Sequence, residues 1–182
     1  MSNYRRVKKA GGLFFFTVVT YHRQKIFNTP KYCALLRETI ISVKAKYPFD
    51  IKGWVLMPDH IHCIWQLPEN DDRNSLRWGQ IKSGFSKRVK PDLHTPEWIN
   101  RSKLNRREST IWQRRYWEHL ILDDNDYLQH MNYIHYNPVK HGLVRQVKEW
   151  PHSTFHRLVK EGIYSEGWGG NVQCPAGQQF GE

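Results

Sequence analysis

The chain has 182 residues, which is enough for one domain with a sizeable hydrophobic core. Its 28 Lys and Arg residues outnumber 17 Asp and Glu residues, and the net charge of +11 implies a polyanionic partner, either nucleic acid or an acidic membrane surface. No apolar run approaches the roughly 20 residues that a spanning helix needs, which disfavours a membrane protein. The start of the chain lacks the apolar segment of a secretion signal, and three scattered cysteines suit a reducing compartment. We therefore expect a soluble cytoplasmic protein with no membrane partner.

The first part of the chain predicts a basic arm followed by a central strand. Residues 1–12 hold four basic side chains, and no acidic residue occurs before Glu38. An ordinary solvated terminus explains this composition equally well. Residues 13–20 are aromatic and β-branched, and they are apolar on both faces, which is typical of a strand inside a sheet.

The next segments predict a helix and a hairpin. Thr29 and Pro30 have the chemistry of a helix start, and residues 32–46 repeat apolar side chains at intervals of three and four. Residues 49–57 and 60–67 are both typical of strands and are separated by a short turn. We therefore expect an antiparallel pair.

A second helix and a polar segment follow. Apolar side chains at helical spacing predict a helix over 76–89. Residues 90–110 are polar and basic, which favours a mobile basic loop, although a plain linker is nearly as good an interpretation. Residues 111–119 are expected to form a fourth strand.

The remaining segments predict two helices and a tail. An acidic pair at 123–124 caps a helix that is expected to run to about residue 137, where Pro138 and Gly142 close it. A short helix is expected near 154–160. The glycine-rich residues 163–182 are expected to be disordered.

The order of these elements predicts an α+β domain over residues 13–162. The sequence β-α-β-β-α-β-α favours a ferredoxin-like antiparallel sheet of four to five strands, with the helices packed on one face.

One strand of the predicted hairpin carries two histidines on a single face. Pro58 and Asp59 form the turn, and His60 and His62 follow it. Alternate residues of a strand point the same way, so the two imidazoles lie side by side. Two imidazoles on one face make half of a metal site. A pair of partly exposed polar positions explains the spacing equally simply, so this pattern alone does not decide.

Helical periodicity separates Tyr133 from the apolar side of its helix. At about 100° per residue, the apolar stripe contains Tyr127, Leu128, Met131 and Ile134. Tyr133 lies roughly opposite that stripe, with Gln129 and Asn137 one turn away on either side. A tyrosine in such a position is more often surface filling than a nucleophile.

Two motifs together resemble a known family. The chain reads Met-Pro-Asp-His-Ile-His at 57–62 and Tyr-Ile-x-x-Asn-Pro-Val-Lys-x-Gly at 133–142. In this order and spacing they resemble the single-tyrosine HUH transposases, and most of all the REP-associated tyrosine transposases, bacterial relatives tied to short palindromic repeats. Other matching pieces are Phe14-Phe15-Phe16-Thr17, Trp112-Gln113, Trp117-Glu118-His119 and Trp150-Pro151-x-Ser153. The resemblance spans roughly residues 4–160, and the basic stretch at 90–110 is longer than compact members have.

The resemblance implies roles for four residues. His60 and His62 match the pair that holds a divalent ion, Tyr133 matches the nucleophile, and Asn137 matches a third ligand from the nucleophile's own helix. Mg²⁺ or Mn²⁺ suits two imidazoles and an amide oxygen better than a closed zinc site does. The implied enzyme cleaves and rejoins single-stranded DNA near hairpins by transesterification through a 5′-phosphotyrosine intermediate.

Five further residues are candidates for contacts with single-stranded or hairpin DNA. Arg5, Arg6, Arg114 and Arg115 could bind phosphates or stack on unpaired bases. His119 could contact the metal site or a phosphate, although a structural hydrogen bond is the stronger interpretation. The sequence leaves a monomer and a homodimer equally open.

Three other functions stay open at this point. A domesticated relative could grip hairpin DNA without cutting it, but it would not need His60, His62 and Tyr133 together. A replication-initiator or relaxase-type nuclease would share the histidine pair, but the chain length and the Tyr-Ile-x-x-Asn-Pro motif argue against it. An unrelated metallohydrolase would use the histidine pair with a bound water and would not depend on the Tyr133 hydroxyl.

Overall fold

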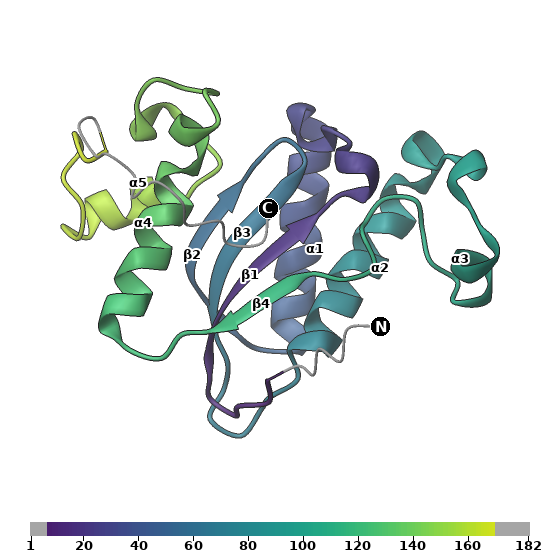
Figure 1. Cartoon of the computed structure of the whole chain (residues 1–182), viewed down its shortest axis with the longest axis horizontal. Helices are drawn as coiled ribbons and strands as arrows, with labels where there is room; N and C mark the ends of the chain where they lie inside the picture. The colour runs from purple at the N-terminus through teal and green to yellow at the C-terminus, as the bar shows by residue number, and fades with distance from the viewer. Residues whose placement is uncertain (1–6, 170–182) are drawn as a thin grey trace.

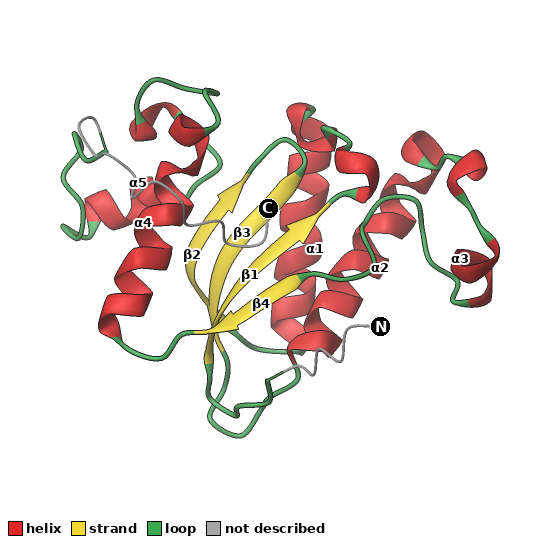
Figure 2. Cartoon of the chain, viewed as in Figure 1, coloured by secondary structure: helices red, strands yellow, loops and turns green. Residues whose placement is uncertain are grey.

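The sheet is built around strand β1 (Leu13–Val19) in a computed structural model that describes residues 7–169 (Figure 1). Strand β1 pairs antiparallel with β3 (His60–Gln66) on one side and with β4 (Trp117–Leu120) on the other. Strand β2 (Asp50–Leu56) pairs antiparallel with β3 at the edge. The strand order β2-β3-β1-β4 confirms the expected α+β class with a four-stranded antiparallel sheet (Figure 2).

Two helices cover one face of the sheet. Helices α1 (Pro30–Lys46) and α2 (Asn74–Leu93) pack on each other and on the side chains of Phe14 and Phe16, which are fully buried. Alternation along β1 turns Phe15 to the opposite face. The aromatic run of the first strand therefore serves two cores.

Helix α4 (Asp124–Lys140) covers that opposite face, so the expectation of helices on one face only is wrong. Phe15 and Ile64 of the sheet pack there with Met131 and Ile134 of the helix. The physical reason is that β1 and β3 are apolar on both sides, and each side must be shielded from water.

The shorter helices lie at the ends of the sheet and around α4. The 3-10 helices are Tyr21–Arg23, Ile26–Asn28, Pro96–Trp98 and Val147–Glu149. The short α-helices are α3 (Arg101–Asn105) and α5 (Phe155–Lys160). No helix of the described chain is long and apolar enough to cross a membrane.

A glycine sets the approach of α4 to the sheet. Gly53 follows an irregularity in the pairing of β2 with β3, and a Cβ atom built on it would lie 2.6 Å from the sulfur of Met131 and 3.2 Å from the Cδ1 atom of Ile134. Real Cβ atoms do not approach neighbours so closely. A side chain at this position would therefore displace the Met131 and Ile134 side chains of α4.

The expectation of a mobile loop over residues 90–110 is wrong. Helix α2 continues through Pro91 to Leu93, and two further helical turns follow. The Lys103 side chain is buried, where its Nζ atom donates to the Ser109 carbonyl at 3.1 Å and lies 3.8 Å from the ring centroid of Tyr21. The segment is packed because residues distant in sequence supply partners for its charges.

The boundaries of two more elements differ from expectation. The fourth strand, expected over 111–119, covers only Trp117–Leu120. Before it, Trp112 makes a single isolated bridge to Thr20 and no regular ladder. Helix α4 continues past Pro138 to Lys140, and Gly142 terminates it at a φ of 66°. Pro138 has no N–H to donate to the Ile134 carbonyl, and the backbone amides of His141 and Leu143 close the helix end on the carbonyls of Asn137 and Pro138.

The predicted disordered tail begins too early. Tyr164 is buried, its hydroxyl donates to the Asn132 side-chain oxygen at 2.9 Å, and its ring lies 4.7 Å from that of Trp168. Both rings pack against Phe155 of α5. The chain up to residue 169 therefore belongs to the core under α4, while the rest of the predicted tail and residues 1–6, the first half of the predicted basic arm, lie outside the described residues.

Candidate active site

Strand β3 presents its two histidines on the face that α4 covers. The Nε2 atoms of His60 and His62 lie 3.1 Å apart, and both rings are buried. The ring of His62 stacks on Phe15 with centroids 5.6 Å apart. The predicted side-by-side arrangement is thus present, although the two positions are buried and not partly exposed.

Each imidazole is oriented through its other nitrogen. The Nδ1 atom of His60 lies 2.6 Å from the Asp59 carboxylate, and the Nδ1 atom of His62 lies 2.8 Å from the Thr17 hydroxyl. Burial works against ionisation of Asp59, but the hydrogen bond from His60 and the Arg23 guanidinium outweigh it, so the pKa of this carboxyl lies below its usual value. An ionised Asp59 accepts the Nδ1 proton of His60, which directs the Nε2 lone pair toward the shared space.

The two Nε2 atoms fit a shared divalent ion. Neighbouring ligands with bonds of roughly 2.1 Å at a right angle stand about 3 Å apart, which is close to the spacing of His60 and His62. Carboxylate and hydroxyl partners on the far nitrogens are the usual support of histidine ligands. The donor set therefore suits a metal better than it suits an apolar core.

Tyr133 of α4 lies directly against this pair. Its ring centroid is 5.2 Å from that of His62 and 6.2 Å from that of Phe15. The side chain is buried, so the expectation that it lies off the packed side of its helix is wrong. The expectation for Leu128 is wrong in the opposite sense, because this residue was expected in the core and is exposed.

The apolar stripe mispredicts which residues of α4 are buried, and the reason is structural. The second half of α4 is enclosed on several sides, by the sheet and by residues of the chain that follows it, including Val147 and Tyr164. A single apolar stripe describes a helix that touches one partner, and this helix touches more than one.

Asn137 is fully buried one turn after Tyr133, on the same helix. Its expected role as a third ligand stays a prediction. Two residues that sequence reasoning did not single out lie nearby: His141, whose ring is 5.9 Å from that of His60, and Lys140, whose Nζ atom is 4.9 Å from the ring centroid of Tyr133. Lys140 and His141 both fall within the motif at 133–142, and His141 repeats the four-residue spacing of Tyr133 and Asn137.

His119 belongs to a different cluster. Its Nε2 atom lies 2.8 Å from the Asp126 carboxylate, and its ring stacks on His130 at 4.7 Å. Ligand atoms of His119, Asp126 and His130 all lie within 4.8 Å of one another. Burial opposes ionisation of Asp126, but the Leu122 amide and His119 outweigh it and hold its pKa below the usual value. Side chains of this cluster are therefore already engaged in hydrogen bonds within the protein. The sequence did not predict that these three residues lie together.

Of the four arginines expected to bind DNA, the structure describes Arg114 and Arg115, which lie on the segment before β4. Arg114 is paired with Glu108 at 2.7 Å, and Arg115 is exposed on the same segment before β4. Arg5 and Arg6 precede the described residues. Their roles stay predictions.

Comparison with known proteins identifies the family. The description "Transposase IS200 like" matches residues 14–137. A protein of Escherichia coli named REP-associated tyrosine transposase is 46% identical over 172 residues, which cover 94% of this chain and 93% of that protein. A protein of Haemophilus influenzae, provisionally given the same name, is 47% identical over 171 residues, which cover 94% of this chain and 95% of that protein. The chain belongs to the REP-associated tyrosine transposases.

A solved structure of this transposase family extends the likeness to the whole fold. It is described as a REP-associated tyrosine transposase bound to a REP hairpin, and it is 43% identical to this chain. The likeness covers 100% of this chain and 98% of that one, with a TM-score of 0.83. The region matched by the family description includes His60, His62, Tyr133 and Asn137, but it ends before Lys140 and His141.

Proposed function

We propose that this transposase is a metal-dependent enzyme that cleaves and rejoins single-stranded DNA beside hairpins of the REP type. One observation carries the proposal: the Tyr133 ring lies against His62, whose Nε2 atom shares a space with that of His60. Strand transfer requires a nucleophile, a metal site and a surface that attracts DNA. The phenol, the two converging imidazoles and the positive net charge of the protein would supply these three. The contact joins residues of one chain, which supports a site that a monomer can assemble without a second copy.

The reaction is a transesterification at phosphorus. The Tyr133 oxygen attacks the scissile phosphate and loses its proton, while the bond from phosphorus to the 3′ oxygen breaks and that oxygen leaves as a hydroxyl. The product is a 5′-phosphotyrosine, and attack by another 3′-hydroxyl reverses the step and joins strands. One ester bond replaces another, so no ATP is required.

Residues of the chain prepare both the phosphate and the nucleophile. A divalent ion, Mg²⁺ or Mn²⁺, held by His60 and His62 with Asn137 as a third ligand, would polarise the scissile phosphate. Asp59 and Thr17 hold the imidazole orientations that this requires. A phenol with a usual pKa near 10 is a weak nucleophile at neutral pH, and the ammonium group of Lys140, 4.9 Å from the Tyr133 ring centroid, would stabilise negative charge that develops during the attack.

Hairpin DNA is the proposed partner, and the cytoplasm is the proposed location. The net charge of +11 suits a polyanion, and a relative 43% identical over the whole fold is described with a REP hairpin bound. Arg114 and Arg115 are proposed to contact the DNA through phosphates.

A trapping experiment tests the proposal. The protein is incubated with Mn²⁺ and a labelled hairpin oligonucleotide with single-stranded flanks, and products are separated in SDS. We expect a covalent adduct with wild-type protein and none with Tyr133→Phe, although that variant should still bind the hairpin. His62→Ala should also lose the adduct, and chelation of the metal should have the same effect.

Two results would contradict the proposal. Tight hairpin binding without any cleavage across many sequences would indicate a domesticated binding protein. Cleavage that survives Tyr133→Phe but not His62→Ala would indicate a hydrolase that uses activated water.

A further inference from the structure

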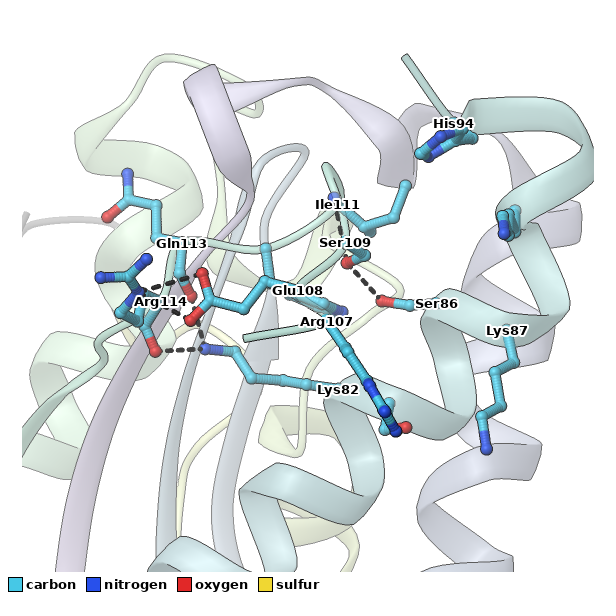
Figure 3. Close-up of a pocket in the computed structure, with 13 residues that line it drawn as sticks. Lys82, Ser86, Lys87, His94, Arg107, Glu108, Ser109, Ile111, Gln113 and Arg114 are labelled. Atoms are coloured by element: carbon cyan, nitrogen blue, oxygen red, sulfur yellow. Dashed lines mark hydrogen bonds and ion pairs between the residues drawn. The ribbon is translucent and has the colours of Figure 1, made fainter. Parts of the chain in front are cut away.

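A basic cavity lies away from the histidine pair, between α2 and the segment that leads to β4. Its volume is about 380 Å³, within the range of small-molecule sites, which start at roughly 300 Å³. Figure 3 shows Lys82 and Ser86 of α2 facing Ser109 and Arg114 of the opposite wall. The cavity exists because residues 90–110 fold back over α2.

Positive charge dominates the lining. It includes three lysines of α2 and two arginines of the opposite wall, namely Lys82, Lys87, Lys90, Arg107 and Arg114. Glu108 is the single acid in this lining, and Arg114 already pairs with it at 2.7 Å. The Nζ atom of Lys82 is also engaged, because it donates to the Gln113 carbonyl at 2.6 Å.

Three of the cations have no acidic partner. Among the described residues, Lys87, Lys90 and Arg107 form no ion pair, and all three are exposed. Arg107 has a φ of 54°, a left-handed conformation that is strained for a residue other than glycine. The rim therefore holds three charges available to an anion, one of them on a strained backbone.

The other lining groups are suited to a nucleoside. Hydroxyl groups come from Ser83, Ser86 and Ser109, and the last two lie 2.9 Å apart. Ile111 and Trp112, which are 1% and 4% exposed, close the floor of the cavity with apolar atoms. Cations for a phosphate, hydroxyls for a sugar and apolar surface for a base match the three parts of one nucleotide.

The cavity shares one end of the sheet with the histidine pair. Gln113 of its lining donates through its backbone amide to the Val19 carbonyl at 3.0 Å, and Val19 pairs with His60. Thr20, which bridges to Trp112, donates through its amide to the Asp59 carbonyl at 2.9 Å. A strand leaving the cavity would thus need to round only this edge to reach the imidazoles on the opposite face.

We propose that this cavity anchors one nucleotide of the single-stranded flank beside the hairpin. Lys87, Lys90 and Arg107 bind its phosphates, and the serines with Ile111 and Trp112 hold the sugar and base. The proposal rests on the proposed function, because it assigns the cavity to the same DNA.

Binding measurements with two hairpins test the proposal. One labelled hairpin carries a four-nucleotide single-stranded flank, and the other is blunt. Both are titrated with full-length protein in a Tyr133→Phe background, so that cleavage does not enter the measurement. The test variant combines Lys87→Ala, Lys90→Ala and Arg107→Gly, since glycine accepts the positive φ without strain.

A matched variant controls for the loss of charge. Arg37→Ala, Lys46→Ala and Lys52→Ala remove three exposed cations that lie outside the cavity. We expect the cavity variant to bind the flanked hairpin roughly tenfold or more weakly, with a smaller salt dependence, and to bind the blunt hairpin within about twofold of its parent. The control variant should weaken both hairpins equally and slightly.

Several outcomes would overturn the proposal. Equal losses for flanked and blunt hairpins would assign the cations to the duplex, and losses equal to those of the control would assign them to general charge. Competition by a free deoxynucleoside monophosphate as strong as competition by a tetranucleotide would assign the cavity to free nucleotides. If parent and variants bound neither hairpin, the proposed function itself would fail, which is a distinct result.

Discussion

At the scale of single residues, the ammonium group of Lys140 lies 4.9 Å from the ring centroid of Tyr133, the proposed nucleophile. Lys140→Met keeps the apolar stem but removes the charge. We expect adduct formation to slow roughly tenfold or more, because the phenolate and the phosphate lose a cation. Single-turnover cleavage measured at several pH values tests this expectation.

Lys140→Arg is the matched control, since it keeps the positive charge. Its rate and pH profile should stay near those of the wild type. A Lys140→Met protein with an unchanged profile would show that the ammonium group does not act on the Tyr133 hydroxyl.

Asn137 is a second residue whose expected role can be tested directly. If its side-chain oxygen is a metal ligand, Asn137→Ala should raise the Mn²⁺ concentration needed for half-maximal cleavage by about 10- to 100-fold. Asn137→Asp supplies a charged oxygen and should restore much of the affinity. Equal metal dependence in all three proteins would exclude Asn137 as a ligand.

The residues of the site were predictable to different degrees. His60 and His62 followed from strand alternation, because that rule needs only local sequence. The burial of Tyr133 did not, since it depends on Tyr164 and other residues that close around α4. Lys140 lay outside the quoted ligand set, and only the fold brings it over the phenol ring.

At the scale of elements, the absence of a side chain at Gly53 controls where α4 rests. Gly53→Val should lower the free energy of unfolding by about 1–3 kcal/mol, because the new methyl groups meet Met131 and Ile134. The helix also carries Tyr133, so cleavage should fall as well. Urea unfolding and adduct formation measure the two effects.

A second glycine provides the control. Gly79 of α2 has nothing within 4 Å of a built Cβ atom, so Gly79→Ala should be neutral or stabilise by up to about 1 kcal/mol. Adding Met131→Ala to Gly53→Val should cost less than the sum of the two single changes, because the smaller side chain makes room. Strict additivity would contradict the close contact.

The elements themselves were predicted best where the pattern of apolar residues is clear. Strands β1 and β3 and helix α1 agree with the expected positions because their patterns are strong and local. The segment 90–110 was predicted as a mobile loop because its partners, such as Tyr21 for Lys103, are far away in sequence. The two-sided packing of the sheet was missed for the same reason.

At the scale of the whole molecule, a buried histidine couples stability to pH. His135 is fully buried, its Nε2 atom lies 2.9 Å from the Thr154 hydroxyl, and burial lowers its pKa to about 3. The unfolded chain takes up this proton near pH 6.5, whereas the folded chain does not. The free energy of unfolding should therefore fall by about 1.4 kcal/mol per pH unit as pH drops from 6.5 toward 3, as far as this group is concerned.

His135→Gln removes that dependence. Its deficit relative to the wild type should shrink as the pH is lowered from 7 to about 4.5, which chemical unfolding at several pH values measures. His22→Asn changes an exposed histidine and should follow the wild-type slope. Parallel curves for His135→Gln and the wild type would show that the folded protein protonates this ring.

The proposed catalytic residues and the basic cavity belong to different parts of the fold, which affects how such proteins can diverge. The proposed chemistry comes from the central strands and from α4, whereas the lining of the basic cavity comes from residues 82–114. Mutations there can alter which nucleic acid is held while the reacting groups keep their spacing. Recognition of the nucleic acid can therefore change during evolution while the proposed catalytic residues stay the same.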